Sequence, residues 1–203
     1  MKRLFSALIL ATAILGSCCS GGDSKTDAQQ AAIDNIMARK SVRSYTDQQV
    51  PDEMIETMLR AAMAAPTAMN VQPWAFVVLK DREVLDALAG KLKYAKMLQE
   101  APLAIVVCAE AKMVDREGNM RENIFWQQDA SAATENLLLA AEALGLGAVW
   151  TAACEGERAA AVREALNLPE NVMPLCVVPI GFPAGDEQPK DKWKPEKIHY
   201  NVW

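Results

Sequence analysis

The most constraining feature of this sequence is a long helix-compatible segment at residues 121–144, whose second half is apolar around nearly its whole circumference. From Ala130 through Leu137 to Ala141 it lacks the continuous polar face that a surface helix keeps. The segment is followed by Gly145, a residue type that commonly comes directly after the end of a helix. Residues 121–144 therefore predict a helix at the centre of a domain or in the interface of an oligomer.

Strand-like and helix-like segments alternate along the rest of the chain. Apolar runs predict strands at residues 74–79, 103–108, 148–151 and 175–180. Helical spacing of apolar residues predicts helices from about residue 26, after Pro51, at 82–89 and at 157–166. Residues 182–203 form an irregular, lysine-rich tail. The alternation on its own favours a doubly wound parallel sheet.

Residues 1–17 have the composition of an export signal. Lys2 and Arg3 precede an apolar stretch that is too short to span a bilayer comfortably. Leu15-Gly16-Ser17-Cys18 resembles a bacterial lipobox, which predicts that Cys18 is lipidated and becomes the first residue of the mature protein. The alternative is an ordinary signal peptide or an uncleaved anchor. We expect an exported protein, lipid-anchored to a bacterial membrane on the periplasmic or outer-membrane side.

After this segment we expect a flexible tether at residues 18–26 and one domain at residues 27–203. Removing residues 1–17 deletes two cations and no acid, so the formal charge falls from −5 to −7. An acidic chain argues against nucleic acid as a partner, and leaves the lipid as the contact with the membrane.

Several kinds of site are disfavoured by residue counts. His199 is the one histidine, which argues against a Ser-His-Asp triad and against a multi-histidine metal site. Beyond Cys18 and Cys19, the cysteines are Cys108, Cys154 and Cys176, an odd number without paired spacing. We therefore expect neither a metal site nor a disulfide framework.

Three polar residues alternate just after the first predicted helix. In an extended backbone the side chains of Arg39, Ser41 and Arg43 point to the same side. Guanidinium groups bind phosphate through charged, bidentate hydrogen bonds. The segment predicts an anion clamp, and the alternative is a solvated basic loop beside the end of a helix.

A second segment, residues 65–74, combines small, hydroxyl and amide side chains before a predicted strand. Asn70 offers both a donor and an acceptor to the edge of a flat polar heterocycle. The alternative is a turn-forming asparagine. Trp74 at the end of the segment is expected in the core rather than stacked on a cofactor.

Together, residues 39–45 and 65–74 resemble the N-terminal signature of the FMN-dependent nitroreductase family. The resemblance continues through residues 129–139 and 143–151 and covers nearly all of residues 30–203. It implies an α+β fold of three layers, α/β/α, in which helices flank a mixed, mostly antiparallel sheet. It also implies an intertwined homodimer. For the sheet we follow the resemblance rather than the alternation of elements.

The resemblance implies FMN as the cofactor and assigns residues to it. On the phosphate and ribityl side these are Arg39, Lys40, Ser41 and Arg43. In a loop that covers the flavin, usually from the partner subunit, they are Pro66, Thr67, Ala68 and Asn70. Near the flavin ring and in a basic pair of the tail they are Trp150, Thr151, Lys190 and Lys192.

Some positions depart from the family pattern or leave an alternative open. Ala68 stands where a hydroxyl residue is often found, and Ala152-Ala153 replace a Glu-Gly pair, so no catalytic acid is assigned. For Lys190 and Lys192 the alternative is a solvated lysine-rich tail.

The function implied is an FMN-dependent NAD(P)H oxidoreductase that reduces nitroaromatic, quinone-like or related acceptors. Because the chain has no dinucleotide-binding motif, NAD(P)H and the acceptor would visit the flavin in turn, in a ping-pong cycle. Residues 110–120 are a short polar stretch where relatives often carry a lid, so we expect an open acceptor pocket. The alternative function is an exported flavin-binding or electron-transfer lipoprotein with little NAD(P)H reductase turnover.

Overall fold

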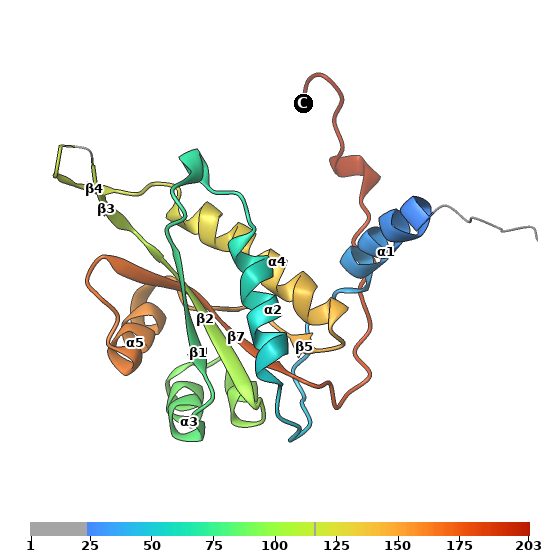
Figure 1. Ribbon diagram of the computed structural model, residues 1–203, viewed down its shortest axis with the longest axis horizontal. Coiled ribbons are helices and arrows are strands. Elements are labelled where there is room, and N and C mark those ends of the chain that lie inside the picture. The colour runs from blue at the N-terminus through green and yellow to red at the C-terminus, as the bar shows by residue number, and fades with distance from the viewer. Residues whose placement is uncertain (1–23, 116) are drawn as a thin grey trace, which may run out of the picture.

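The computed structural model describes residues 24–115 and 117–203, and its centre is an antiparallel sheet. The strands β1 (Trp74–Leu79), β2 (Leu103–Glu110), β7 (Val172–Gly181) and β5 (Gly147–Ala148) lie in that order (Figure 1). The strand β6 (Thr151–Ala152) also pairs with β7. Every pairing among the described strands is antiparallel, so the parallel sheet favoured by alternation alone is wrong.

Helices cover both faces of this sheet and produce three layers. On one face, α2 (Asp52–Met63) and α4 (Trp126–Ala143) enclose a core with Leu103, Ile105 and Val107 of β2. On the other face, α3 (Arg82–Lys91) and α5 (Gly156–Leu166) pack against the alternate residues Ala104, Val106 and Cys108. The predicted three-layer α+β arrangement is confirmed.

The strand β2 shows why the sequence pattern suggested the wrong sheet. Its residues from Leu103 to Ala109 are all buried, because helices lie on both sides. A strand covered on both faces is a continuous apolar run, a pattern typical of parallel sheets in α/β proteins. The composition of such a run does not encode the direction of its neighbours.

The central helix was predicted five residues too early. The structure places Met120–Glu122 in β4, which pairs with β3 (Lys112–Val114), and α4 begins at Trp126. Its C-terminus agrees with the prediction: Gly145 has φ +72, and the Leu146 amide donates to the Ala141 carbonyl at 2.9 Å. This is the hydrogen bond of a Schellman motif.

Other boundaries need smaller corrections. The single strand predicted at residues 148–151 is divided into β5 and β6. Helix α1 (Ser24–Ala38) includes the last three residues of the predicted tether, while Cys18 and the predicted signal at residues 1–17 lie outside the described residues. The tail at residues 182–203 is irregular as predicted, apart from the short helix η3 (Pro195–Lys197).

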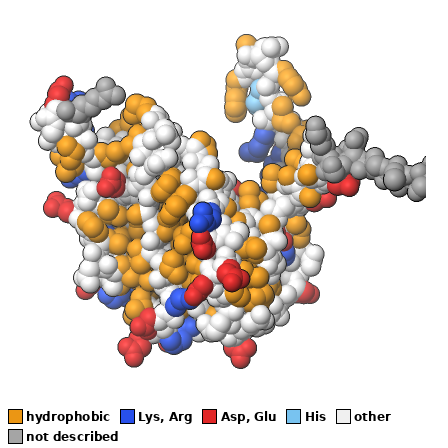
Figure 2. All heavy atoms as spheres, in the orientation of Figure 1, with side chains coloured by type: hydrophobic (Ala, Val, Ile, Leu, Met, Phe, Trp, Pro, Cys, Tyr) orange, Lys and Arg blue, Asp and Glu red, His pale blue; other side chains and the backbone are white. Residues whose placement is uncertain are grey.

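Helix α1 and the tail extend from the same side of the body (Figure 1). Both expose large apolar side chains (Figure 2). Met37 of α1 is 71% exposed, and Trp193 and Trp203 of the tail are 72% and 98% exposed. In the part of the chain that the structure describes, we find no helix with the length and hydropathy needed to cross a membrane.

Candidate functional site

The backbone after α1 is held against the sheet by its inward-facing residues. The Val42 amide donates to the Ala148 carbonyl at 3.0 Å, and the Val42 side chain is buried. The Tyr45 hydroxyl lies 2.7 Å from the Val42 carbonyl and 3.2 Å from the Pro179 carbonyl. Burial raises the pKa of Tyr45, so this hydroxyl stays protonated and able to donate. Ser41 and Arg43, on either side of buried Val42, are left more exposed, as the alternating pattern predicted.

A pocket of 420 Å³ brings this segment together with the C-terminal tail. Its lining includes six of the residues predicted to bind the cofactor: Arg39, Lys40, Ser41, Arg43, Lys190 and Lys192. Glu187 and Gln188 complete the lining. Residues close to the two ends of the sequence therefore form one cationic site.

Two of these cations are paired with carboxylates on α4. The Nε of Arg39 lies 3.4 Å from Oε1 of Glu135, and Nζ of Lys40 donates to Oε1 of Glu142 at 2.8 Å. Together with Glu187, these make three carboxylates against five cations, which leaves two positive charges. A phosphate monoester carries about −1.5 to −2 charge at neutral pH, so the donor set fits the phosphate of FMN.

Glu187 was not predicted as part of this site. Its Oε1 accepts a hydrogen bond from the Arg43 amide at 3.2 Å. Its own backbone amide and that of Arg43 hold the pKa of its carboxyl below the usual range. Glu187 thus ties the tail to the Arg43 segment while it stays charged, a contact between distant residues that no local pattern signals.

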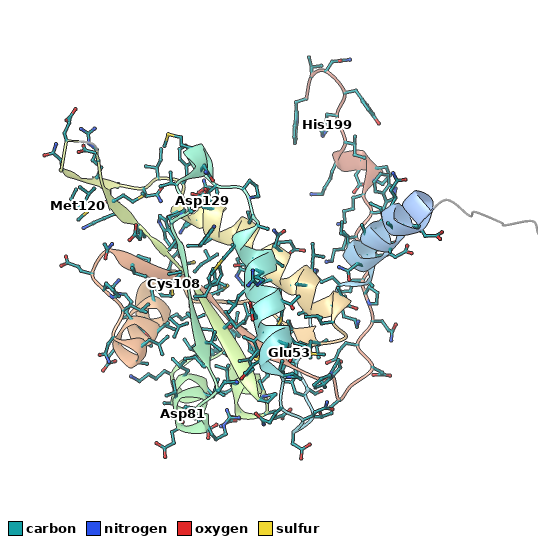
Figure 3. The ribbon with its side chains drawn as sticks, in the orientation of Figure 1. Glu53, Asp81, Cys108, Met120, Asp129 and His199 are labelled. Atoms are coloured by element: carbon teal, nitrogen blue, oxygen red, sulfur yellow. The ribbon has the colours of Figure 1, made fainter. Side chains whose placement is uncertain are left out.

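The second predicted segment lies at the other end of α4. The Ala68 amide, in the short helix η1 (Ala68–Asn70), donates to Oδ1 of Asp129 in the first turn of α4 at 2.8 Å (Figure 3). Lys40 instead contacts Glu142 near the end of that helix. At 1.5 Å per residue, Asp129 and Glu142 are about 20 Å apart along the axis. Pro66, Thr67, Ala68 and Asn70 therefore do not join the pocket within one chain.

Trp150 and Thr151 are tied into the core. The Thr151 hydroxyl donates to the Val177 carbonyl at 2.5 Å and is buried, and Thr151 pairs with Val177 in the sheet. Trp150 packs against the core cluster between the sheet, α2 and α4. Trp74 packs in the same core with its ring 5.9 Å from that of Phe76, which agrees with its predicted core position.

An apolar groove of 320 Å³ lies between η1 and the β3–β4 hairpin. Met69 and Val71 line it on one side, and Met113, Ile124 and Phe125 line it on the other. Residues 110–120 were expected to form a short polar stretch, and this expectation was wrong in part. The hairpin of β3 and β4 presents apolar side chains toward the loop that was predicted to cover the flavin.

Comparisons with known proteins agree with this architecture. The family model described as "Nitroreductase family" matches residues 36–92 and 86–182. A relative from Methanothermobacter thermautotrophicus, with the provisional name NADH dehydrogenase/NAD(P)H nitroreductase, is 40% identical over 184 residues, covering 90% of this chain and 91% of its own.

Two crystal structures have the same fold. One, of a protein from Bacteroides thetaiotaomicron, is 50% identical with a TM-score of 0.78, covering 85% of this chain and 98% of its own. The other, a protein from Desulfovibrio desulfuricans in complex with FMN, is 30% identical with a TM-score of 0.69, covering 85% and 97%.

Proposed function

Because this chain belongs to the nitroreductase family, we propose that it works as an FMN-dependent NAD(P)H oxidoreductase. The observation that carries the proposal is the cationic pocket formed by Arg39, Lys40, Ser41, Arg43 and the tail lysines. The FMN bound to the Desulfovibrio relative supports the same cofactor. The name of the Methanothermobacter relative favours a reductase over a flavin carrier with little turnover.

The residues of the pocket bind and orient the cofactor. Arg39 and Arg43 supply planar donors for a phosphate, and Ser41 supplies a hydroxyl between them. Lys190 and Lys192 add charge from the tail. FMN supplies the redox chemistry, taking a hydride from NAD(P)H and passing electrons to an acceptor. The protein contributes binding and electrostatics, and we assign no side chain to proton transfer.

The complete site is formed by two chains, in a homodimer. In one chain the loop carrying Asn70 and the cationic pocket lie at opposite ends of α4, about 20 Å apart by the rise of the helix. Exposed apolar side chains on α1 and on the tail, among them Met37, Trp193 and Trp203, supply a surface for a second copy. In such a dimer the loop of one subunit covers the flavin held by the other.

The acceptor is a flat, largely apolar compound of the nitroaromatic or quinone class. The groove lined by Met69, Met113 and Phe125 lies beside the covering loop. Of the three charged residues in its lining, Arg121 and Asp115 form an ion pair with each other, and Glu122 is the third. The open form of the groove favours loose selectivity. NAD(P)H and the acceptor would use the exposed flavin face in turn.

A spectrum of the purified protein tests the function. We expect a yellow protein whose flavin band bleaches rapidly when NADH or NADPH is added anaerobically and returns when a quinone is added. A colourless protein that fails to take up added FMN contradicts the cofactor. A flavin band that persists with both nicotinamides supports the flavin-carrying alternative instead.

We also propose that the mature protein begins at a lipidated Cys18 and is anchored to a bacterial membrane from the exported side. The support is the Leu15-Gly16-Ser17-Cys18 pattern after an apolar segment. Mass spectrometry of the membrane fraction should find a diacylated N-terminal cysteine, absent in Cys18→Ser. A soluble chain that keeps Met1 contradicts this proposal.

A further inference from the structure

The loop at residues 66–72 has an unusual backbone. Met69, Asn70 and Gln72 have φ values of 53, 55 and 54, in the left-handed region. Non-glycine residues rarely adopt this region, because the side chain approaches the backbone too closely. Three such residues within four positions persist only where surrounding contacts hold them. The contacts of this loop therefore decide the conformation of Asn70.

Most of these contacts are within the loop itself. The Gln72 amide donates to Oγ1 of Thr67 at 3.0 Å, and the amides of Asn70 and Val71 donate to carbonyls within the loop at 3.1 Å each. Among the described residues, one hydrogen bond joins residues 66–72 to another element of the fold: the Ala68 amide donates to Oδ1 of Asp129 at 2.8 Å. The position of the loop on α4 depends on this bond.

Asp129 is buried, which is an unfavourable position for a carboxylate. Its side chain is 4% exposed, and its Oδ2 is buried without a hydrogen-bond partner among the described residues. A buried charged group is unfavourable unless it is paired. Its position in the first turn of α4 offsets part of that penalty through the helix dipole. A carboxylate also makes a stronger hydrogen bond to a backbone amide than a neutral acceptor does.

We propose that Asp129 is a positioning residue for the loop that covers the flavin. Its carboxylate holds the Ala68 amide against the N-terminal turn of α4, and so keeps Asn70 in the left-handed conformation that presents its amide to the cofactor. This inference rests on the proposed function for its effect on FMN. Its structural part, the restraint of the loop, does not depend on FMN.

Three variants on α4 test the role. Asp129→Leu removes the acceptor, whereas Asp129→Asn keeps an oxygen that can accept from the Ala68 amide. Thr134→Val is the control, because Thr134 is buried on the same helix and bonds to the Ala130 carbonyl rather than to the loop. We expect the FMN dissociation constant to rise about tenfold in Asp129→Leu, the change produced by loss of about one hydrogen bond, and to stay within about twofold in the other two.

A change on the loop tests the same bond from the donor side. Ala68→Pro leaves Asp129 intact but removes the amide hydrogen. Thr67 already has the extended backbone, φ −131 and ψ 154, that suits a residue before proline. We expect Ala68→Pro to weaken FMN binding as much as Asp129→Leu does, even where Asp129→Leu fails to fold. Wild-type FMN affinity in Ala68→Pro overturns the proposal, as does an Asp129→Asn protein as weak as Asp129→Leu.

Hydrogen exchange separates the restraint from the function. Without FMN, the Ala68 amide should be protected in the wild type, Asp129→Asn and Thr134→Val, and should exchange at least tenfold faster in Asp129→Leu. Unchanged exchange in Asp129→Leu refutes the restraint. A wild type that never binds FMN while the exchange result holds refutes the proposed function and leaves the restraint of the loop standing.

Discussion

Val42, between Ser41 and Arg43, is in direct contact with Gly147 of strand β5. A Cβ built on Gly147 would lie 2.5 Å from Cγ1 of Val42 and 2.7 Å from its Cβ. The neighbouring amide of Val42 also bonds to the Ala148 carbonyl at 3.0 Å. The absence of a side chain at residue 147 therefore lets the Arg39–Arg43 segment lie close to the sheet.

We expect Gly147→Ala to destabilise the protein by about 1–3 kcal/mol, because overpacking forces the Val42 segment outward. Urea unfolding measures this loss. Gly90→Ala is the matched control, since a Cβ there meets nothing within 4 Å and Gly90 lies in helix α3. That variant should be neutral or slightly more stable. If Val42→Ala does not relieve part of the loss in a double variant, the contact is not its cause.

The double variant Arg39→Ala and Arg43→Ala should be purified largely without flavin. Each charged contact to a phosphate contributes about 1.5–3 kcal/mol, so the dissociation constant should rise by roughly 10² to 10⁴. Absorbance of released flavin per chain measures occupancy. The control is Arg60→Ala, an arginine paired with Glu56 on the exposed surface of α2. Full flavin occupancy in the double variant would show that this pocket does not bind the FMN phosphate.

Lys190→Ala with Lys192→Ala should weaken FMN binding less than the arginine pair does, by about three- to tenfold, because both lysines are exposed and screened by salt. The loss should shrink as ionic strength rises. Lys197→Ala, on η3 and outside the pocket lining, is the control. Equal affinity at low salt in the double variant and the wild type would assign these lysines to a solvated tail.

The thiols of Cys108 and Cys176 should resist alkylation in the native protein. Burial raises the pKa of each to about 12, from an ordinary value of 9.0. Because the folded state holds these protons more tightly, the resulting stabilisation is complete below about pH 9 and is lost as the pH rises from 9 toward 12. Site-resolved mass spectrometry at pH 8 should find Cys154, which is partly exposed, labelled before Cys108 and Cys176. Fast labelling of Cys176 in the native protein would contradict its burial.

The boundaries of β1 and the start of α3 were predicted correctly, because both depend on residues close by in the sequence. The strand β1 was placed correctly at Trp74–Leu79, and α3 begins at Arg82 as predicted, where Asp81 accepts from the Glu83 amide at 2.8 Å. The start of α4 was misplaced because residues 120–122 are used by β4, which pairs with a strand several residues earlier. Residues 120–122 join the hairpin because they pair with another strand, and the helical spacing of apolar residues carries no information about that pairing.

The candidate site shows the same division. Alternation of Arg39, Ser41 and Arg43 was a local pattern, and the structure places all three along one pocket. Glu187 and Asp129 were missed because their importance comes from single contacts, with Arg43 across 144 positions and with Ala68 across 61. Neither contact produces a periodic pattern that could be recognised in the sequence.

The pocket joins residues 39–43 to residues 187–192, and this separation along the chain limits when the cofactor can bind during synthesis. Lys192 is synthesised well after Arg39 and Arg43, so a growing chain contains the arginines of the pocket long before their lysine partners. Flavin capture with full affinity therefore requires that synthesis has passed Lys192. Chains truncated before Lys190 would keep the sheet and its covering helices but would bind FMN more weakly.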